Sequence, residues 1–279
     1  MYEYKVCTSN SRKLLNSKIE KDEKAFKNIT MRLLMAYKIY QRTNSSESEK
    51  WCGLYHSLFD DNINTVQDPA MKCWLLGRQL ISLDFKTYQT KINKLLDDMG
   101  TILNNHAEQQ INPYLVWAQG YLAVYYARNN KNENYEQTIE KTLIECSKLQ
   151  DQTCKLWGYV MCLMAAGKKK DYENYQNIVL QIMQFDKESG DFIKALKKIP
   201  MNDFQTWAMA IAMEAAAILN NDKDLQLLST AITYNMVSET MDKYDKALTT
   251  TYFNSAHFIK SSLHDDAMAE QPNGSFVCN

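Results

Sequence analysis

The chain has 279 residues, a net charge of −1, and only 8 glycines and 4 prolines. Because turns between strands draw heavily on glycine and proline, this composition excludes a collagen-like chain and argues against a β-sandwich or an α/β enzyme with glycine-rich loops. The balance of basic and acidic residues argues against a nucleic-acid-binding protein.

Residues 1–67 are predicted to form an N-terminal helical cap. After Asp22, apolar residues recur with the spacing of one helix face: Phe26, Ile29, Leu33, Tyr37 and Tyr40. A second helix is predicted to begin at Ser46 and to carry another apolar series: Trp51, Leu54, Tyr55 and Leu58. Residues 1–42 contain ten Lys or Arg and four Asp or Glu, so the cap begins with a basic helix.

Helix start and stop signals recur from residue 68 onward. Asp68 and Asn112 each stand before a proline, which favours an N-cap followed by the first helical residue. Gly100 and Gly167 are predicted at helix ends. A short extra helix is predicted over Asp191–Lys198 and is closed by a proline. In total, the sequence predicts about twelve helices and no strand.

A repeat runs through residues 68–237. At an offset of 40 residues, Trp117 falls on Trp157, and Glu133-Asn134-Tyr135 falls on Glu173-Asn174-Tyr175. Two further units follow the same pattern: the hexapeptide Asp84-Phe85-Lys86-Thr87-Tyr88-Gln89, which opens a helix, and the segment from Trp207 to Leu225. Such a repeat indicates one supersecondary unit that stacks on copies of itself.

We interpret each unit as an antiparallel helix pair. The Trp of the first helix is predicted to pack against the Tyr or Leu near the start of the second helix. Mostly small residues stand three positions after the Trp residues and are predicted to let helix backbones approach closely: Gly77, Gly120, Val160 and Ala210.

This spacing and aromatic placement resemble the tetratricopeptide-like family of helical hairpin repeats, over about residues 68–237. The resemblance implies an all-α fold in which hairpins stack into a curved α-solenoid, with residues 238–270 as a C-terminal helical cap and residues 271–279 as a flexible tail. The first helices of such hairpins line a concave groove. We expect that groove to present the following partner-binding residues: Leu122, Tyr125, Tyr126, Tyr159, Cys162, Ala208 and Ala212.

The sequence therefore predicts a non-enzymatic scaffold that holds another protein, as a helix or an extended segment, in this groove. Such a protein regulates, chaperones or inhibits its partner, for example a bacterial effector. No cofactor is expected, because the chain lacks nucleotide-binding loops, paired CxxC motifs and a GxSxG nucleophile motif.

Two other function classes stay open. An all-helical enzyme or metal protein would use His257, His264 and Asp265 near the C-terminus. A membrane-surface protein would use the basic helix within residues 11–42, with Leu33, Leu34, Tyr37 and Tyr40 in the lipid interface.

The cysteines and the terminus favour a cytoplasmic, reducing location. The chain has seven cysteines, an odd number, and no apolar signal-peptide stretch at its start, which leaves export as an effector without such a signal open. Cys146, Cys154 and Cys162 are expected in the core or the groove, and Cys278 is expected to be exposed. The most apolar segment, Trp207–Leu219, contains Glu214 and is too short to span a membrane.

Overall fold

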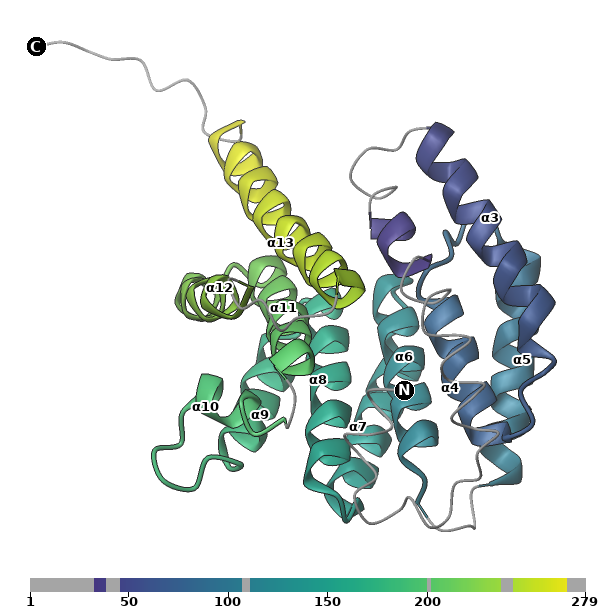
Figure 1. Ribbon diagram of the computed structural model, residues 1–279, viewed down its shortest axis with the longest axis horizontal. Coiled ribbons are helices and arrows are strands. Elements are labelled where there is room, and N and C mark those ends of the chain that lie inside the picture. Colours follow the sequence, from purple (N-terminus) through teal and green to yellow (C-terminus); the bar gives the residue numbers. More distant parts are fainter. Residues whose placement is uncertain (1–32, 39–45, 107–110, 200–201, 237–242, 270–279) are drawn as a thin grey trace, which may run out of the picture.

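The computed structural model describes residues 33–38, 46–106, 111–199, 202–236 and 243–269 (Figure 1). These residues form helices and connecting turns and no strand, which confirms the predicted all-α fold class. Residues 33–38 are helical, and eleven labelled helices follow in the described part of the chain. Their bounds are α3 (Ser46–Ile63), α4 (Pro69–Leu80), α5 (Gln89–Asn105), α6 (Pro113–Arg128), α7 (Asn132–Lys148), α8 (Gln152–Lys169), α9 (Tyr172–Met183), α10 (Phe192–Leu196), α11 (Asn202–Ile218), α12 (Asp222–Met236) and α13 (Lys243–Ala269).

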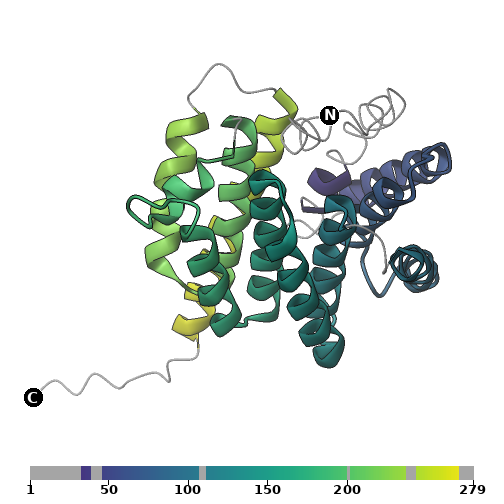
Figure 2. The same ribbon diagram turned by 90° about the horizontal axis from the view of Figure 1, so that it is seen from below.

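Four helix pairs make up most of the described chain: α4 with α5, α6 with α7, α8 with α9, and α11 with α12. The first helices of these pairs lie side by side in the order α4, α6, α8 and α11. Helix α3 lies at one end of the molecule and α12 at the other (Figures 1 and 2). Helix α13 packs against α11, and the short α10 contacts α9 and α11.

The predicted helix starts at the two Asx-Pro pairs are confirmed. The Asp68 side chain accepts a hydrogen bond from the Met71 backbone N–H at 2.6 Å, and the Asn112 side chain accepts one from the Tyr114 N–H at 2.9 Å. Asp191 caps the extra short helix in the same way. Each cap satisfies a backbone donor that has no partner within its own helix.

The first repeat unit begins later than the sequence suggests. Asp84 accepts a hydrogen bond from the Thr87 backbone N–H at 3.0 Å, which stabilises a turn, and α5 starts only at Gln89. The prediction that a helix opens directly after Asp84 is therefore wrong. An acidic cap followed by aromatic residues is compatible with both a turn and a helix start.

The turns inside the three later pairs share one geometry. Asn130, Lys170 and Asn220 each adopt a left-handed backbone conformation, with φ of 54°, 60° and 57°. Each stands 13 residues after the Trp that opens its pair. The backbone N–H of the following residue donates to the carbonyl five positions back in all three turns, at 2.9 to 3.0 Å. This bond caps the C-terminus of each first helix, so the pairs are alike in detail as well as in order.

The Trp residues of the first helices contact one another between neighbouring pairs. The ring centroids of Trp74 and Trp117 lie 6.2 Å apart, and those of Trp157 and Trp207 lie 5.1 Å apart. The prediction that each Trp packs on the Tyr of its own second helix is wrong. Trp117 lies near the start of α6 and Tyr135 near the start of α7, so they stand at opposite ends of an antiparallel pair.

Tyr135 and Tyr175 instead join consecutive second helices. The hydroxyl of Tyr135 donates to the Asp171 carboxylate at 3.1 Å, and that of Tyr175 donates to Asp224 at 3.0 Å. Both rings are buried. These bonds join the α6–α7 pair to the α8–α9 pair, and the α8–α9 pair to the α11–α12 pair.

The predicted close approach at small residues is confirmed for two of the four positions. A Cβ added at Gly120 would lie 2.6 Å from Met161 Cβ, and one at Gly77 would lie 3.0 Å from Tyr121 Cβ. The predicted helix ends at Gly100 and Gly167 are wrong, since α5 continues past the first and α8 past the second. At Gly167 an added Cβ would meet the Ala215 backbone, so this glycine allows α8 to approach α11.

Candidate partner-binding site

The structure places six of the seven predicted groove residues in the interior. Exposure is between 0 and 8% for these six: Leu122, Tyr125, Tyr159, Cys162, Ala208 and Ala212. Only Tyr126 is partly exposed. The prediction that this set lines an open surface is therefore wrong.

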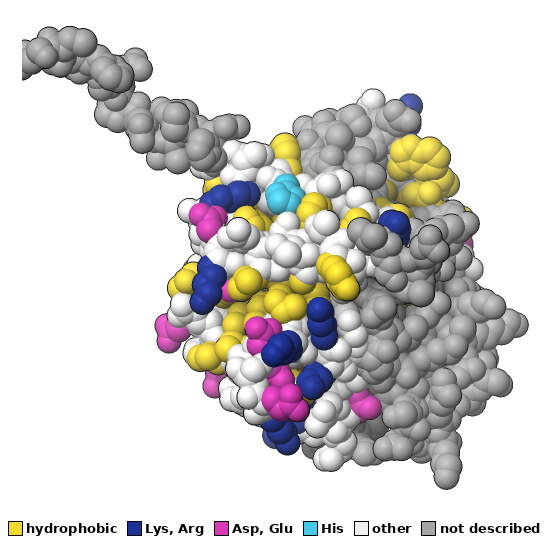
Figure 3. Space-filling model, turned by 60° about the vertical axis from the view of Figure 1, so that its left-hand side comes forward, with side chains coloured by type: hydrophobic (Ala, Val, Ile, Leu, Met, Phe, Trp, Pro, Cys, Tyr) yellow, Lys and Arg dark blue, Asp and Glu magenta, His cyan; other side chains and the backbone are white. Residues whose placement is uncertain are grey.

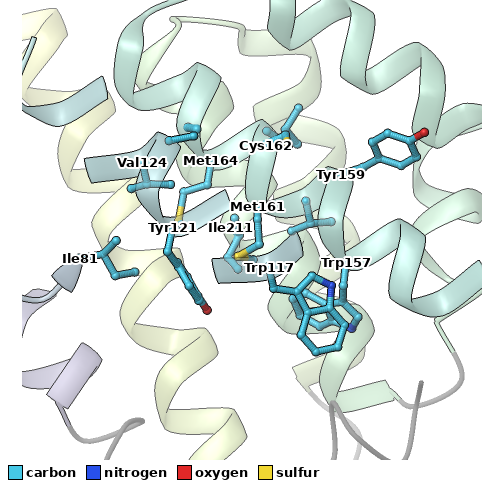
Figure 4. Packing of buried hydrophobic residues seen from close by; sticks show 14 of the residues in the cluster. Ile81, Trp117, Tyr121, Val124, Trp157, Tyr159, Met161, Cys162, Met164 and Ile211 are labelled. Carbon is cyan, nitrogen blue, oxygen red and sulfur yellow. The ribbon is translucent and has the colours of Figure 1, made fainter. Parts of the chain in front are cut away.

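The reason is the face of the first helices that these residues occupy. Cys162 of α8 lies beside Cys146 of α7, and the ring centroids of Tyr159 and Phe185, which follows α9, lie 6.1 Å apart. Figure 4 shows Tyr159 and Cys162 on one side of α8, away from Val124 of α6. Tyr159 and Cys162 thus face α7 and the end of α9, whereas Val124 and Met164 line the pocket described below.

The cysteines of the described residues are part of the core. Cys52, Cys73, Cys146 and Cys162 are free and buried, and Cys154 is buried and disulfide-bonded. Burial raises the pKa of the Cys146 thiol well above its ordinary value, and the adjacent Cys162 raises it further. A neutral buried thiol is a poor nucleophile and acts as a small apolar side chain. Cys278 lies outside the described residues.

An inner pocket forms where the C-terminal ends of α4, α6 and α8 meet residues 33–38 and α13. Its lining consists of Leu34, Tyr37, Lys38, Ile81, Val124, Arg128, Met164, Lys168 and Tyr252. Its volume is about 20 Å³, which is room for a water molecule and not for an organic ligand. Residues 33–38 lie between α13 and α3 (Figure 1).

A buried carboxylate joins three elements at this pocket. Glu214 of α11 is 2% exposed and accepts a hydrogen bond from Lys168 Nζ of α8 at 2.7 Å. Lys38 Nζ contacts both carboxylate oxygens, with 2.6 Å to Oε2. Burial alone would raise the pKa of Glu214, but the two ammonium groups outweigh it and lower the pKa to about 2.

Lys38 is held in an environment that disfavours its charge. Burial lowers the pKa of Lys38 to about 7, and the attraction of Glu214 offsets this only in part. Its Nζ also lies 4.6 Å from the centre of the Tyr252 ring. The ammonium group thus connects residues 33–38 with both α11 and α13.

A second polar contact holds the preceding residue. The Arg128 guanidinium contacts the Tyr37 hydroxyl and lies 4.9 Å from the centre of the Tyr37 ring. The same guanidinium donates to the Ile81 carbonyl at 2.5 Å, just past the end of α4. Tyr37 therefore contacts α6, and the adjacent Lys38 contacts α11.

The apolar side of this segment is buried as well. Leu33 and Leu34 are 0% and 2% exposed, and Tyr37 is 6% exposed. The membrane-surface hypothesis required these side chains at a lipid interface, whereas the structure uses them in the core. Tyr40 and residues 11–32 lie outside the described residues.

The histidines near the C-terminus do not form a site in the part that the structure describes. His257 is exposed and its ring lies 4.6 Å from that of Phe253. The side chains of His264 and Asp265 lie outside the described residues. Among the described side chains, no group of three or more His, Cys, Asp or Glu could hold a metal ion. Within the same residues, no helix combines the length and apolar character that crossing a bilayer requires.

Apolar side chains also reach the surface. On the face in Figure 3 they gather in a band bordered by Lys, Arg, Asp and Glu side chains. The exposed ones on the helices from α9 onward are Tyr172, Leu180, Leu227, Tyr234 and Phe258. They come from three helices and lie away from the inner pocket.

No family model, curated protein or solved structure matches this chain. The residues of the inner pocket that the sequence analysis missed do leave a signal. Arg128 and Lys168 each stand 11 residues after the lead Trp of their helix, and Glu214 is a single acid inside the most apolar segment. Charges at matching positions of apolar helices indicate a polar contact inside the stack.

Proposed function

We propose that this protein is a non-enzymatic scaffold whose inner face binds an amphipathic helix of a partner protein and thereby regulates, chaperones or inhibits that partner. The four helix pairs, in this proposal, form a short tetratricopeptide-like solenoid. Stacked pairs of this kind present their first helices along one continuous face.

One observation carries the proposal: a helical segment of the chain itself, residues 33–38, already lies on that face. It buries Leu34 in the inner pocket, places Tyr37 against Arg128, and places Lys38 against Glu214. A helix in a groove is a common mode of peptide recognition, with anchors on one side of the helix. The face therefore has the shape and the polar partners that a helix requires.

The contacts also define the chemistry of the partner. Its helix would carry an aliphatic residue for the pocket, then an aromatic residue with a hydroxyl, and next to it a Lys. The buried Glu214 favours a partner that carries this Lys. A partner without the Lys would leave the carboxylate paired with Lys168 alone, which costs free energy in a buried site. The partner helix would take the place of residues 33–38.

The test uses a fluorescently labelled peptide of residues 28–42 and the full chain. Leu34→Asp places a carboxylate in the apolar pocket and is expected to release the internal segment. We expect this variant to bind the peptide at least about tenfold more tightly than the unmodified chain does. Leu227→Asp, at a residue that is 49% exposed on α12, is the control and is expected to behave like the unmodified chain.

Two further measurements test the role of the Lys and the folding of the variants. A peptide with Lys38→Ala is expected to lose most of the affinity, because it lacks the cation for Glu214. Far-UV circular dichroism establishes that each variant is folded, and the pair Tyr37→Ala and Lys38→Ala replaces Leu34→Asp if that variant unfolds. Equal affinity of released and unmodified chains, or of both peptides, would rule out the proposal.

A further inference from the structure

Helix α3 carries a second apolar face that points away from the core. Trp51, Leu54 and Leu58 are 48%, 47% and 38% exposed, and the ring of the partly buried Tyr55 stacks on Trp51 with centroids 6.1 Å apart. The α3 stripe is defined as these four residues. Tyr55 also packs against the core. The buried residues of the same helix are Cys52, His56, Phe59 and Ile63.

The α3 stripe differs from the other exposed apolar residues of the described chain. Ile144 and Phe258 each stand alone on their helices, and Leu227 and Tyr234 are two turns apart on α12. Among the side chains that the structure describes, only those of α3 include three exposed large apolar residues within two turns. Helix α3 also lies at the end of the molecule (Figure 2), where a stack of helices normally presents a polar surface to water.

The α3 stripe is symmetric along its own helix. Its positions 51, 54, 55 and 58 are mirrored about the midpoint between Leu54 and Tyr55. If two α3 helices lie antiparallel about a twofold axis, Trp51 of each copy faces Leu58 of the other, and Leu54 faces Tyr55. A twofold interface joins the same patch of both copies, so that patch must be complementary to itself.

The charges beside the α3 stripe fit the same arrangement. Lys50 and Asp61 are both exposed and lie eleven residues apart, which places them on the same flank of the helix at about 100° per residue. In an antiparallel pair this flank meets itself. Lys50 of one copy then lies about 3 Å along the helix axis from Asp61 of the second copy, at 1.5 Å per residue. Two ion pairs form by symmetry.

We infer that two copies of this chain associate through antiparallel α3 helices. The inference is independent of the proposed function, since the α3 stripe shares no residue with the inner pocket. The dimer presents two inner pockets, so a partner with two suitable helices gains avidity from it.

Sedimentation velocity of the full chain tests the inference at about 1 to 100 μM, the range of modest protein affinities. We expect a concentration-dependent dimer. Leu54→Asp places two carboxylates in the centre of the interface and is expected to weaken association at least about tenfold. Leu180→Asp, at a residue that is 56% exposed on α9, is expected to leave it unchanged.

A charge-reversal series tests the antiparallel arrangement itself. Lys50→Asp places two acids side by side and is expected to weaken the dimer, and Asp61→Lys in the same chain is expected to restore it. A monomer at every concentration overturns the inference, and so does a dimer that survives Leu54→Asp. Failure of Asp61→Lys to restore association overturns the antiparallel pairing. Because both sites are exposed, circular dichroism is expected to show the same fold in all variants.

Discussion

At the scale of single residues, the molecule depends on charges that its apolar helices bury. Glu214 sits among buried alanines and methionines of α11 and is satisfied only by Lys38 and Lys168. Removing one partner of such a buried group leaves uncompensated charge, which costs more than the intact pair contributes. Glu214→Gln would remove the negative charge that favours the ammonium form of the buried Lys38, and would leave the Lys168 ammonium group beside a neutral amide.

We expect Glu214→Gln to lower the free energy of unfolding at pH 7 by about 3 kcal/mol. The pKa of Glu214 is lowered from 4.5 to about 2, so its stabilisation is complete above pH 4.5 and is lost as pH falls toward 2. Urea unfolding at several pH values measures this, and the difference between the two chains should shrink below pH 4.5. A constant difference across that range would contradict the assignment.

Asp222→Asn is the matched control for that experiment. Asp222 pairs with Lys260 at 2.5 Å, but its side chain is 73% exposed. Exposed pairs contribute at most about 1 kcal/mol, because water screens them. Its removal should therefore change the free energy of unfolding little.

The sequence indicated part of this site and not the rest. Glu214 is visible as a single acid in the most apolar segment, but its partner Lys38 lies 176 residues earlier, and no local pattern joins them. The predicted groove failed for a geometric reason. Adjacent residues of a helix point about 100° apart. Val124 therefore lines the inner pocket, whereas the adjacent Tyr125 contacts Tyr126 and Lys131.

At the scale of elements, the order of the helices could be predicted from the sequence, but the sites where two helices pack closely could not. The caps at Asp68 and Asn112 depend on adjacent residues, so the sequence contains all of their information. Gly167 was expected at a helix end, whereas it lies within α8 against Ala215 of α11. A glycine that ends a helix and one that admits a neighbouring helix look the same in a sequence.

This difference predicts opposite effects of two glycine substitutions. In Gly167→Ala the new Cβ would lie 2.7 Å from the Ala215 Cα, and since backbone yields little, we expect a loss of about 1–3 kcal/mol. In Gly100→Ala nothing lies within 4 Å of the new Cβ, so the better helix former should stabilise by about 0.5–1 kcal/mol. Chemical denaturation measures both, and equal effects would show that α8 and α11 are not so closely packed.

At the scale of the whole molecule, the two ends of the described chain close the stack. An open array of helix pairs is stabilised mainly between neighbours, so its parts unfold with some independence. Here residues 33–38 and Tyr252 of α13 meet at one pocket with Ile81, Val124 and Met164, which belong to successive pairs. Contacts of such long sequence separation couple pairs that are not consecutive. Arg78 of α4 does the same, because its guanidinium lies 5.2 Å from the centre of the Trp207 ring of α11.

This closure predicts a single cooperative unfolding transition, which depends on Tyr252. Circular dichroism and tryptophan fluorescence should report the same urea midpoint for the unmodified chain, because Trp74 and Trp207 lie in different pairs that unfold together.

Tyr252→Ala empties a buried site at the junction and should lower the free energy of unfolding by about 3–5 kcal/mol. It should also separate the two midpoints, since the pairs then depend on their neighbours and on the contact of Arg78 with Trp207. Phe258→Ala, on the exposed side of the same helix, should leave a single transition. If the midpoints stay together in Tyr252→Ala, contacts between neighbouring pairs suffice for cooperativity, and the closure through α13 adds stability without coupling.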